Sequence, residues 1–133
     1  MHLVYDGTFE GFLTLVYDVY YEKLSPTKVT KEHIQVELVF EDIVEIYTNK
    51  EKYTKVFTAL KSKFNKFYYE KIFNTFMCDT KNFELDLLNY IILGFKDQKQ
   101  LENINYSFIN NMAKYEHELF RHVHKMYAYA RFK

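Results

Sequence analysis

Residues 2–24 read HLVYDGTFEGFLTLVYDVYYEKL and predict a strand, a tight turn and a helix in succession. The first four residues of this stretch are a short β-prone run, and Asp6-Gly7 can turn the chain after it. Thr8 can then cap the N-terminus of a helix over residues 9–24, which Ser25-Pro26 would stop. The chain is therefore expected to open with a strand followed directly by a helix.

The rest of the chain predicts a mainly helical α+β fold, with about five helices and a small two-stranded sheet in one domain over residues 1–133. Residues 43–47 alternate in strand fashion and are the best partner for the strand at residues 2–5. The helix between them permits a parallel pair. Residues 27–42 are ambiguous. Further helices are expected over residues 50–64, 67–77 and 81–93, and from about residue 105 onward.

Local signals bound these helices. A capping box is expected at Thr48-Asn49-Lys50-Glu51, and a second cap at Asp79-Thr80. Gly94 can end the third of these helices, and residues 96–100 are expected to be a polar linker. Asn103 or Asn105 can cap the last helix.

Composition bounds the protein class. With 133 residues, of which 48% are apolar and 20% aromatic, the chain can build a core. Only three glycines and one proline favour long helices over a many-turned β-sandwich. No apolar run is long enough to span a membrane, and the N-terminus lacks the pattern of a signal peptide. Cys78, the single cysteine, suits a reducing compartment. A cytoplasmic protein is expected.

The last stretch, residues 105–133, reads NYSFINNMAKYEHELFRHVHKMYAYARFK and predicts an amphipathic helix. At 3.6 residues per turn, one arc about 120° wide holds Lys114, His117, Arg121, His124, Lys125 and Arg131, whereas apolar residues collect on another face. Lysine, arginine and histidine on this basic arc can contact phosphates or base edges, and a nearby tyrosine can stack on a base. The candidate nucleic-acid-binding residues are Lys114, His117, Arg121, His124, Lys125, Tyr129 and Arg131. An amphipathic core helix whose outer side is merely basic is the alternative.

The formal net charge is zero, but the two parts of the chain differ in sign. Residues 1–47 carry nine acidic and three basic residues, and residues 48–133 carry fifteen basic and nine acidic ones. Such an asymmetry suits a phosphate-facing side, and it equally suits a chance distribution over a solvated surface. A second set of lysines, for which solvation is the simpler explanation, consists of Lys52, Lys55, Lys61, Lys63, Lys66 and Lys71.

The sequence shows no complete catalytic constellation. His117 and His124 lie two turns apart on the predicted helix, about 10 Å along its axis, which is too far for two ligands of one metal ion. HExxH, CxxC and glycine-rich phosphate motifs are lacking, so neither a metal nor a cofactor is expected. The apolar neighbours of Cys78 favour a buried thiol over a nucleophile. A weaker alternative is an enzyme that pairs His124 with Asp6 or Glu10, which must then lie within about 3 Å or share a water.

Four stretches together resemble a bacterial family of DNA-metabolism and DNA-repair proteins whose activity is unsettled. They read LVYDGTFEGFLTLVYDVYYEK (3–23), EIYTNKEKYTKVFTALKSKF (45–64), LLNYIILGFK (87–96) and HKMYAYARF (124–132). Members are encoded beside a radical SAM protein and usually continue well beyond the Arg-Phe pair. The resemblance therefore implies a DNA-repair context, a radical SAM partner and the N-terminal part of a longer architecture.

Carried over position by position, the resemblance marks residues at both ends of the chain. They are Tyr5, Asp6, Gly7, Phe9, Glu10 and Gly11 at the front, and His124, Lys125, Arg131 and Phe132 at the back. The chain departs from the family pattern at His122, where an acidic residue is usual, and at Ala128-Tyr129, where Gly-Phe is usual. Both departures weigh against a catalytic use of that corner.

The leading hypothesis is a DNA-repair accessory module that binds nucleic acid, DNA foremost, through its basic C-terminal helix. The first alternative is a protein-interaction adaptor without nucleic-acid affinity, for which the acidic residues 37–45 would be the docking surface. The second alternative is part of an enzyme that a further C-terminal region completes.

Overall fold

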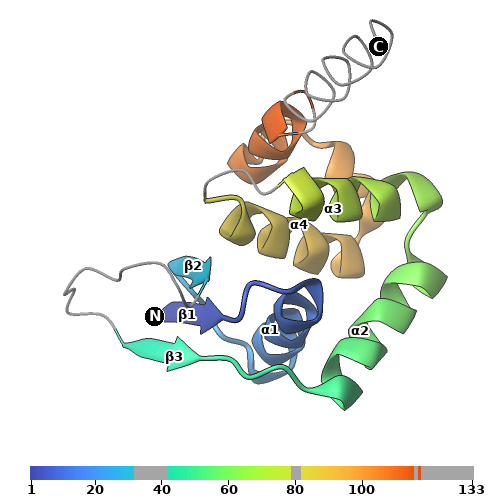
Figure 1. The fold of residues 1–133 in the computed structure, drawn as a ribbon. Helices are drawn as coiled ribbons and strands as arrows, with labels where there is room; N and C mark the ends of the chain where they lie inside the picture. The colour runs from blue at the N-terminus through green and yellow to red at the C-terminus, as the bar shows by residue number, and fades with distance from the viewer. Residues whose placement is uncertain (32–41, 79–81, 116, 118–133) are drawn as a thin grey trace, which may run out of the picture.

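The computed structural model describes residues 1–31, 42–78, 82–115 and 117, and these form a mainly helical fold with one small sheet (Figure 1). The fold class predicted from the sequence is confirmed at this level. The helices are α1 (Phe9–Glu22), α2 (Lys50–Lys63), α3 (Lys66–Cys78), α4 (Glu84–Lys96) and the short 3₁₀ helix η1 (Gln98–Glu102). The strands are β1 (His2–Tyr5), β2 (Lys28–Lys31) and β3 (Ile43–Glu45). Residues 107–115 and 117 are also helical.

The predicted strand, turn and helix at the N-terminus are confirmed. All four residues of β1 are buried, and Gly7 lies in the turn with a φ of 89°. The Thr8 hydroxyl oxygen accepts a hydrogen bond of 3.0 Å from the Gly11 amide and so caps α1. The helix ends when Lys23 takes a left-handed backbone conformation with a φ of 52°, ahead of the stop predicted at Ser25-Pro26.

Within the described residues the sheet has three parallel strands in the order β2-β1-β3, so the prediction of two strands was wrong by one. The predicted parallel pair between β1 and the strand near residues 43–47 is confirmed. Leu3 of β1 lies opposite Val44 on one side and Val29 on the other. The missed strand, β2, reads KVTK. Four residues with a lysine at each end are too short a pattern to distinguish a strand from a loop.

α2 begins at Lys50, but its cap is Asn49 and not Thr48. The Asn49 side chain accepts a hydrogen bond of 3.1 Å from the Lys52 amide. Thr48 instead donates its hydroxyl to the Asp6 carboxylate over 2.6 Å. The predicted capping box therefore fails because a residue far away in the sequence competes for the threonine hydroxyl.

α4 continues past Gly94, which was predicted to end it. Gly94 is buried, and a Cβ at this position would lie 2.5 Å from Cζ of Phe64. This glycine therefore allows α4 to pack closely against the end of α2. Residues 98–102, which overlap the linker predicted at residues 96–100, form η1. The cap predicted at Asp79-Thr80 lies outside the described residues.

The last described helix begins at residue 107, so neither Asn103 nor Asn105 caps it. The Asn103 side chain accepts a hydrogen bond of 3.0 Å from the Asn105 amide, in the turn before the helix. The Tyr106 carbonyl accepts the first backbone hydrogen bonds of the helix. Asparagine here stabilises the turn that leads into the helix.

A single core connects the sheet with the helices. In Figure 1, α1 lies between the sheet and α2, while α3 and α4 lie above it. The core draws fully buried side chains from the sheet and from α1, α2, α3 and α4, among them Leu3, Tyr5, Phe12, Leu60, Ile72, Leu87 and Ile91. Because α1 is held on several sides, the tyrosines on its remaining face are fixed in position relative to α2 and α4.

Candidate nucleic-acid interface

The predicted basic arc begins within the described part of the chain. Lys114 and His117 are helical and exposed, as the prediction requires. The remaining candidates, Arg121, His124, Lys125, Tyr129 and Arg131, lie outside the described residues, as does Phe132. Beyond His117 the basic arc therefore stays a prediction.

Two aromatic residues of the front motif belong to the core. Tyr5 is 1% exposed, and its ring meets that of Phe12 edge-on with 5.7 Å between the centroids. Phe9 is half-buried and packs on Phe73 and Phe76 of α3. Both motif residues therefore stabilise the fold through aromatic packing.

Asp6, at the end of β1, holds two segments of the chain together. Its Oδ1 accepts hydrogen bonds of 2.9 and 2.6 Å from the Thr8 amide and hydroxyl, and its Oδ2 accepts one of 2.6 Å from the Thr48 hydroxyl. Gly11 packs against the same carboxylate, since a Cβ there would lie 2.1 Å from Oδ1 of Asp6. Asp6 and Gly11 thus attach the start of α1 to the loop that precedes α2.

Burial raises the pKa of Asp6, but the hydrogen bonds from Thr48 and Thr8 outweigh it and bring the pKa below the ordinary aspartate value. An ionised carboxylate accepts hydrogen bonds and has no proton to donate. Glu10 is exposed in the first turn of α1, where its charge complements the helix dipole. His124, the proposed partner in catalysis, lies outside the described residues, so that alternative stays a prediction.

The lowered pKa of Asp6 predicts a loss of stability in acid. A carboxylate with a lower pKa in the folded chain stabilises the fold above its unfolded pKa, and this contribution is lost as the pH falls below about 4. Since the group is partly exposed, we expect Asp6→Asn to cost about 1–2 kcal/mol at about pH 7, and clearly less at about pH 3. Urea unfolding followed by circular dichroism at both pH values measures this.

The exposed Asp42 provides the control for that experiment, because Asp42→Asn also removes one negative charge. An Asp6→Asn variant that loses the same stability at both pH values would contradict an ionised Asp6 as the source of the stabilisation.

The thiol of Cys78 is partly buried and donates to the Tyr115 carbonyl oxygen over 3.6 Å. Among the described residues, no group of three or more His, Cys, Asp or Glu side chains is placed to hold a metal ion.

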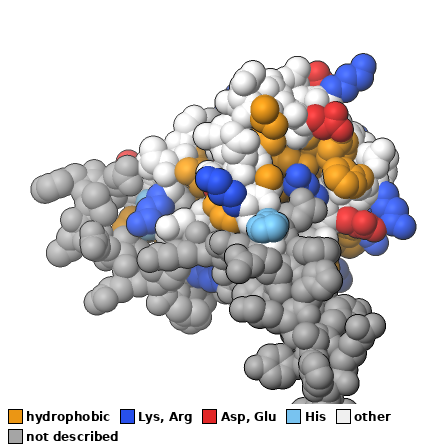
Figure 2. All heavy atoms as spheres, turned by 90° about the horizontal axis from the view of Figure 1, so that it is seen from above, with side chains coloured by type: hydrophobic (Ala, Val, Ile, Leu, Met, Phe, Trp, Pro, Cys, Tyr) orange, Lys and Arg blue, Asp and Glu red, His pale blue; other side chains and the backbone are white. Residues whose placement is uncertain are grey.

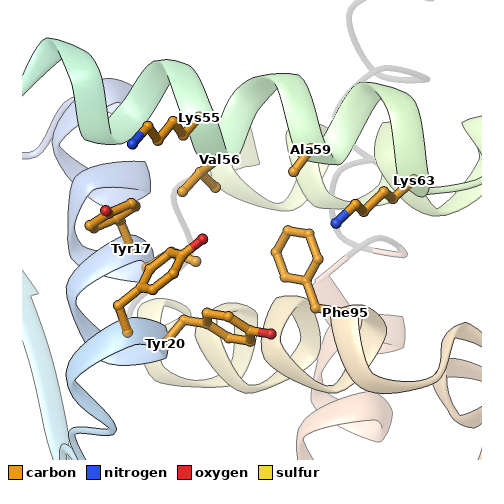
Figure 3. A pocket seen from close by; sticks show the side chains of 9 residues that line it. Tyr17, Tyr20, Lys55, Val56, Ala59, Lys63 and Phe95 are labelled. Carbon is orange, nitrogen blue, oxygen red and sulfur yellow. The ribbon is translucent and has the colours of Figure 1, made fainter.

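A hollow between α1, α2 and the end of α4 combines aromatic rings with lysines (Figure 3). We call it the tyrosine groove, and its volume is about 110 Å³. Val16, Val56 and Ala59 line it between the larger side chains. The larger side chains are Tyr17, Tyr20 and Tyr21 from α1, Lys55 and Lys63 from α2, and Phe95 from α4. Because three helices supply these residues, the packing of the core sets the shape of the groove.

The rings of the tyrosine groove form a continuous series. The centroids of Tyr17 and Tyr21 lie 4.4 Å apart, and those of Tyr21 and Tyr20 lie 5.3 Å apart. The ring centroid of Tyr20 lies 6.0 Å from that of Phe95, and the centroid of Phe95 lies 5.1 Å from that of the buried Phe64. The exposed rings are thus held by neighbours that reach into the core, so a planar ligand would meet a preformed aromatic surface.

The predicted second set of lysines divides into engaged and available side chains. Lys52 forms an ion pair of 2.8 Å with Asp18, and the hydrogen bond in this pair is the main cause of its raised pKa. The Lys61 ammonium lies over an aromatic ring. Lys55 and Lys63 are exposed and form no ion pair with another described residue. Two lysines at the tyrosine groove are therefore free to bind an anion.

Charges of both signs share the face seen from above in Figure 2, where basic, acidic and hydrophobic side chains are interspersed. The described part of this face is therefore not uniformly basic. At the tyrosine groove, by contrast, positive charge adjoins a concentrated aromatic surface.

The tyrosine groove was missed by sequence reasoning, which assigned the lysines of α2 to solvent and no binding role to the tyrosines of α1. The spacing of Tyr17, Tyr20 and Tyr21 is a signal that the sequence does contain, since it places three tyrosines on one stripe of a helix. Phe95 comes from another helix, and only tertiary packing brings it to the same place.

No helix among the described residues is long and apolar enough to cross a lipid bilayer. Comparisons with protein-family models, with curated proteins and with solved structures found no match.

Proposed function

We propose that the chain binds single-stranded nucleic acid and that the tyrosine groove holds an unpaired base. The observation that carries this proposal is the meeting of a continuous series of aromatic rings with Lys55 and Lys63. Aromatic rings stack on any base, and lysines neutralise the backbone phosphates, so single-strand-binding proteins commonly combine the two.

The shape of the tyrosine groove favours an unpaired base over a duplex. The hollow is small and lies between helices, with Tyr17 and Phe95 partly buried at its sides. Bases in a duplex show only their edges in the grooves, so they cannot lie flat on a recessed ring unless they are flipped out. An unpaired base has a free face, and this supports single-stranded nucleic acid as the ligand.

The family resemblance supplies a setting for this activity. We propose an accessory module in bacterial DNA metabolism, located in the cytoplasm, with a radical SAM protein as its partner. The predicted basic arc of the C-terminal helix would provide a second contact with the same strand. Binding at the tyrosine groove does not require that second contact.

Lys55→Gln/Lys63→Gln is expected to weaken binding of single-stranded DNA about tenfold at low salt, which corresponds to about 1.4 kcal/mol. Each lost phosphate contact lowers the slope of log affinity against log salt by about 0.7 for a single strand, so the slope should fall by about 1.4. Fluorescence anisotropy with labelled single- and double-stranded DNA across a salt series measures both quantities.

The matched control for this experiment is Lys66→Gln/Lys99→Gln, which removes two exposed lysines that do not line the tyrosine groove. Arg121→Ala/Arg131→Ala tests the predicted basic arc in the same series. If the wild-type chain binds no DNA even at low salt, the proposed function is wrong.

A protein-interaction adaptor is the second candidate, and one observation favours it. Phe73 and Met77 of α3 are one helical turn apart and are 44% and 61% exposed, so they present apolar surface to solvent. Most of the predicted acidic docking surface, residues 37–45, lies outside the described residues. An adaptor without nucleic-acid affinity would give no anisotropy change at any salt concentration, which separates the two candidates.

A further inference from the structure

A second hollow adjoins the tyrosine groove and shares two of its residues. Tyr20 and Tyr21 line both, and the second hollow has a volume of about 620 Å³. It lies near the ends of α1 and α4, and its other lining residues include Leu24, Ile92, Lys23 and Lys96. The two hollows therefore meet at the pair of tyrosines.

We infer that a bound single strand runs across Tyr20 and Tyr21 from the tyrosine groove into the second hollow. This inference rests on the proposed function and adds the course of the strand. One unpaired base occupies the tyrosine groove, the nucleotides next to it lie along the tyrosine pair, and nucleotides further along the strand occupy the second hollow. The phosphates face lysines on both sides of the tyrosine pair.

The orientation of the two shared rings suits successive bases. The planes of Tyr20 and Tyr21 stand 80° apart, with 5.3 Å between their centroids. Tyr21 leans on Tyr17, whereas Tyr20 approaches Phe95, so each ring is held by a different neighbour. The pair thus offers two differently oriented aromatic surfaces, and the bases of an unstacked strand can turn to meet each of them.

The charges around the second hollow suit an anionic ligand. Lys23 and Lys96 are exposed, and neither forms an ion pair with another described residue. Asp97 follows Lys96, but its carboxylate caps η1. The charge of Glu22 acts on Lys52 and raises its pKa, so this exposed carboxylate is partly compensated. The charges around the second hollow, with two lysines that are unpaired among the described residues and with compensated carboxylates, therefore favour phosphate binding.

Oligothymidylates of two to eight nucleotides, labelled with fluorescein and followed by fluorescence anisotropy at low salt, test the inference. For the wild-type chain, affinity should rise with length until both hollows are occupied. Lys23→Gln/Lys96→Gln keeps the aliphatic stems of both side chains. We expect this variant to lose about tenfold in affinity for the longest probe, and less than about twofold for the shortest, because only the longer strand reaches the second hollow.

The outcomes separate this inference from the proposed function. If Lys23→Gln/Lys96→Gln matches the wild-type chain at every length while Lys55→Gln/Lys63→Gln weakens binding, the strand stays in the tyrosine groove and the inference is overturned. If no oligothymidylate binds the wild-type chain, both proposals fall. Lys66→Gln/Lys99→Gln serves as the charge-matched control, circular dichroism verifies folding, and free fluorescein as a competitor detects binding of the dye alone.

Discussion

Replacing Gly94 with alanine is expected to destabilise the fold by about 1–2 kcal/mol, although alanine is the better helix former by about 1 kcal/mol. The added Cβ would lie 2.5 and 2.7 Å from two ring carbons of Phe64, and 3.1 Å from a methyl carbon of Leu101. Overpacking of a core costs about 1–3 kcal/mol. Phe64 and Leu101 are only 6% and 3% exposed, so neither side chain can move aside freely and the cost should lie in the upper part of that range.

Urea unfolding of Gly94→Ala beside Asn89→Ala separates the effect of helix propensity from the effect of overpacking the core. Asn89 is exposed on α4, so its replacement changes helix propensity without adding a buried atom. A Gly94→Ala variant at least as stable as the wild-type chain would show that the Phe64 ring has room to shift. Since Phe64 packs against Phe95, such a shift would also disturb the tyrosine groove.

Tyr20→Ala/Tyr21→Ala is expected to weaken the binding of single-stranded DNA about 10- to 100-fold. Stacking of a base on an aromatic side chain contributes about 1–3 kcal/mol, and each tenfold change in affinity corresponds to about 1.4 kcal/mol. The two side chains are 46% and 63% exposed, so their removal should leave the core filled. Anisotropy titrations at two salt concentrations measure the loss.

The salt dependence distinguishes the tyrosines from the lysines. Loss of stacking should lower the affinity without changing the salt slope, whereas loss of a phosphate contact lowers both. Tyr47→Ala is the control for the double variant Tyr20→Ala/Tyr21→Ala, because Tyr47 is 77% exposed and lies outside both hollows. Unchanged affinity in the double tyrosine variant would contradict base stacking even if the lysine variants weaken binding.

The N-terminal strand and helix could be predicted because their signals are local. The turn at Asp6-Gly7 and the cap at Thr8 each act within a few residues of the chain. β2 could not be predicted in the same way, since it depends on pairing with β1 and on a buried hydrogen bond of 2.7 Å between His2 and Thr30. Its four residues carry little of that information themselves.

Thr48 and Gly94 show why local signals fail. From the sequence, Thr48 was expected to begin a helix and Gly94 to end one. In the structure, each instead contacts a residue that is distant in the sequence. Thr48 binds Asp6, and Gly94 makes room for Phe64. The tyrosine groove poses the same problem on a larger scale, because three helices must pack before its residues meet. The basic arc could be proposed from the sequence because it lies on a single helix.

β1 precedes both of its neighbouring strands in the chain and is also the central strand of the sheet, and this order matters during synthesis. The Thr27 hydroxyl reaches the Met1 carbonyl from 26 residues away, and the Thr48 hydroxyl reaches Asp6 from 42 residues away. A nascent chain therefore displays the apolar β1 strand well before either neighbouring strand has left the ribosome. Exposed strands of this kind are prone to aggregate. β1 is thus a segment that a chaperone at the ribosome exit would protect until its neighbouring strands arrive.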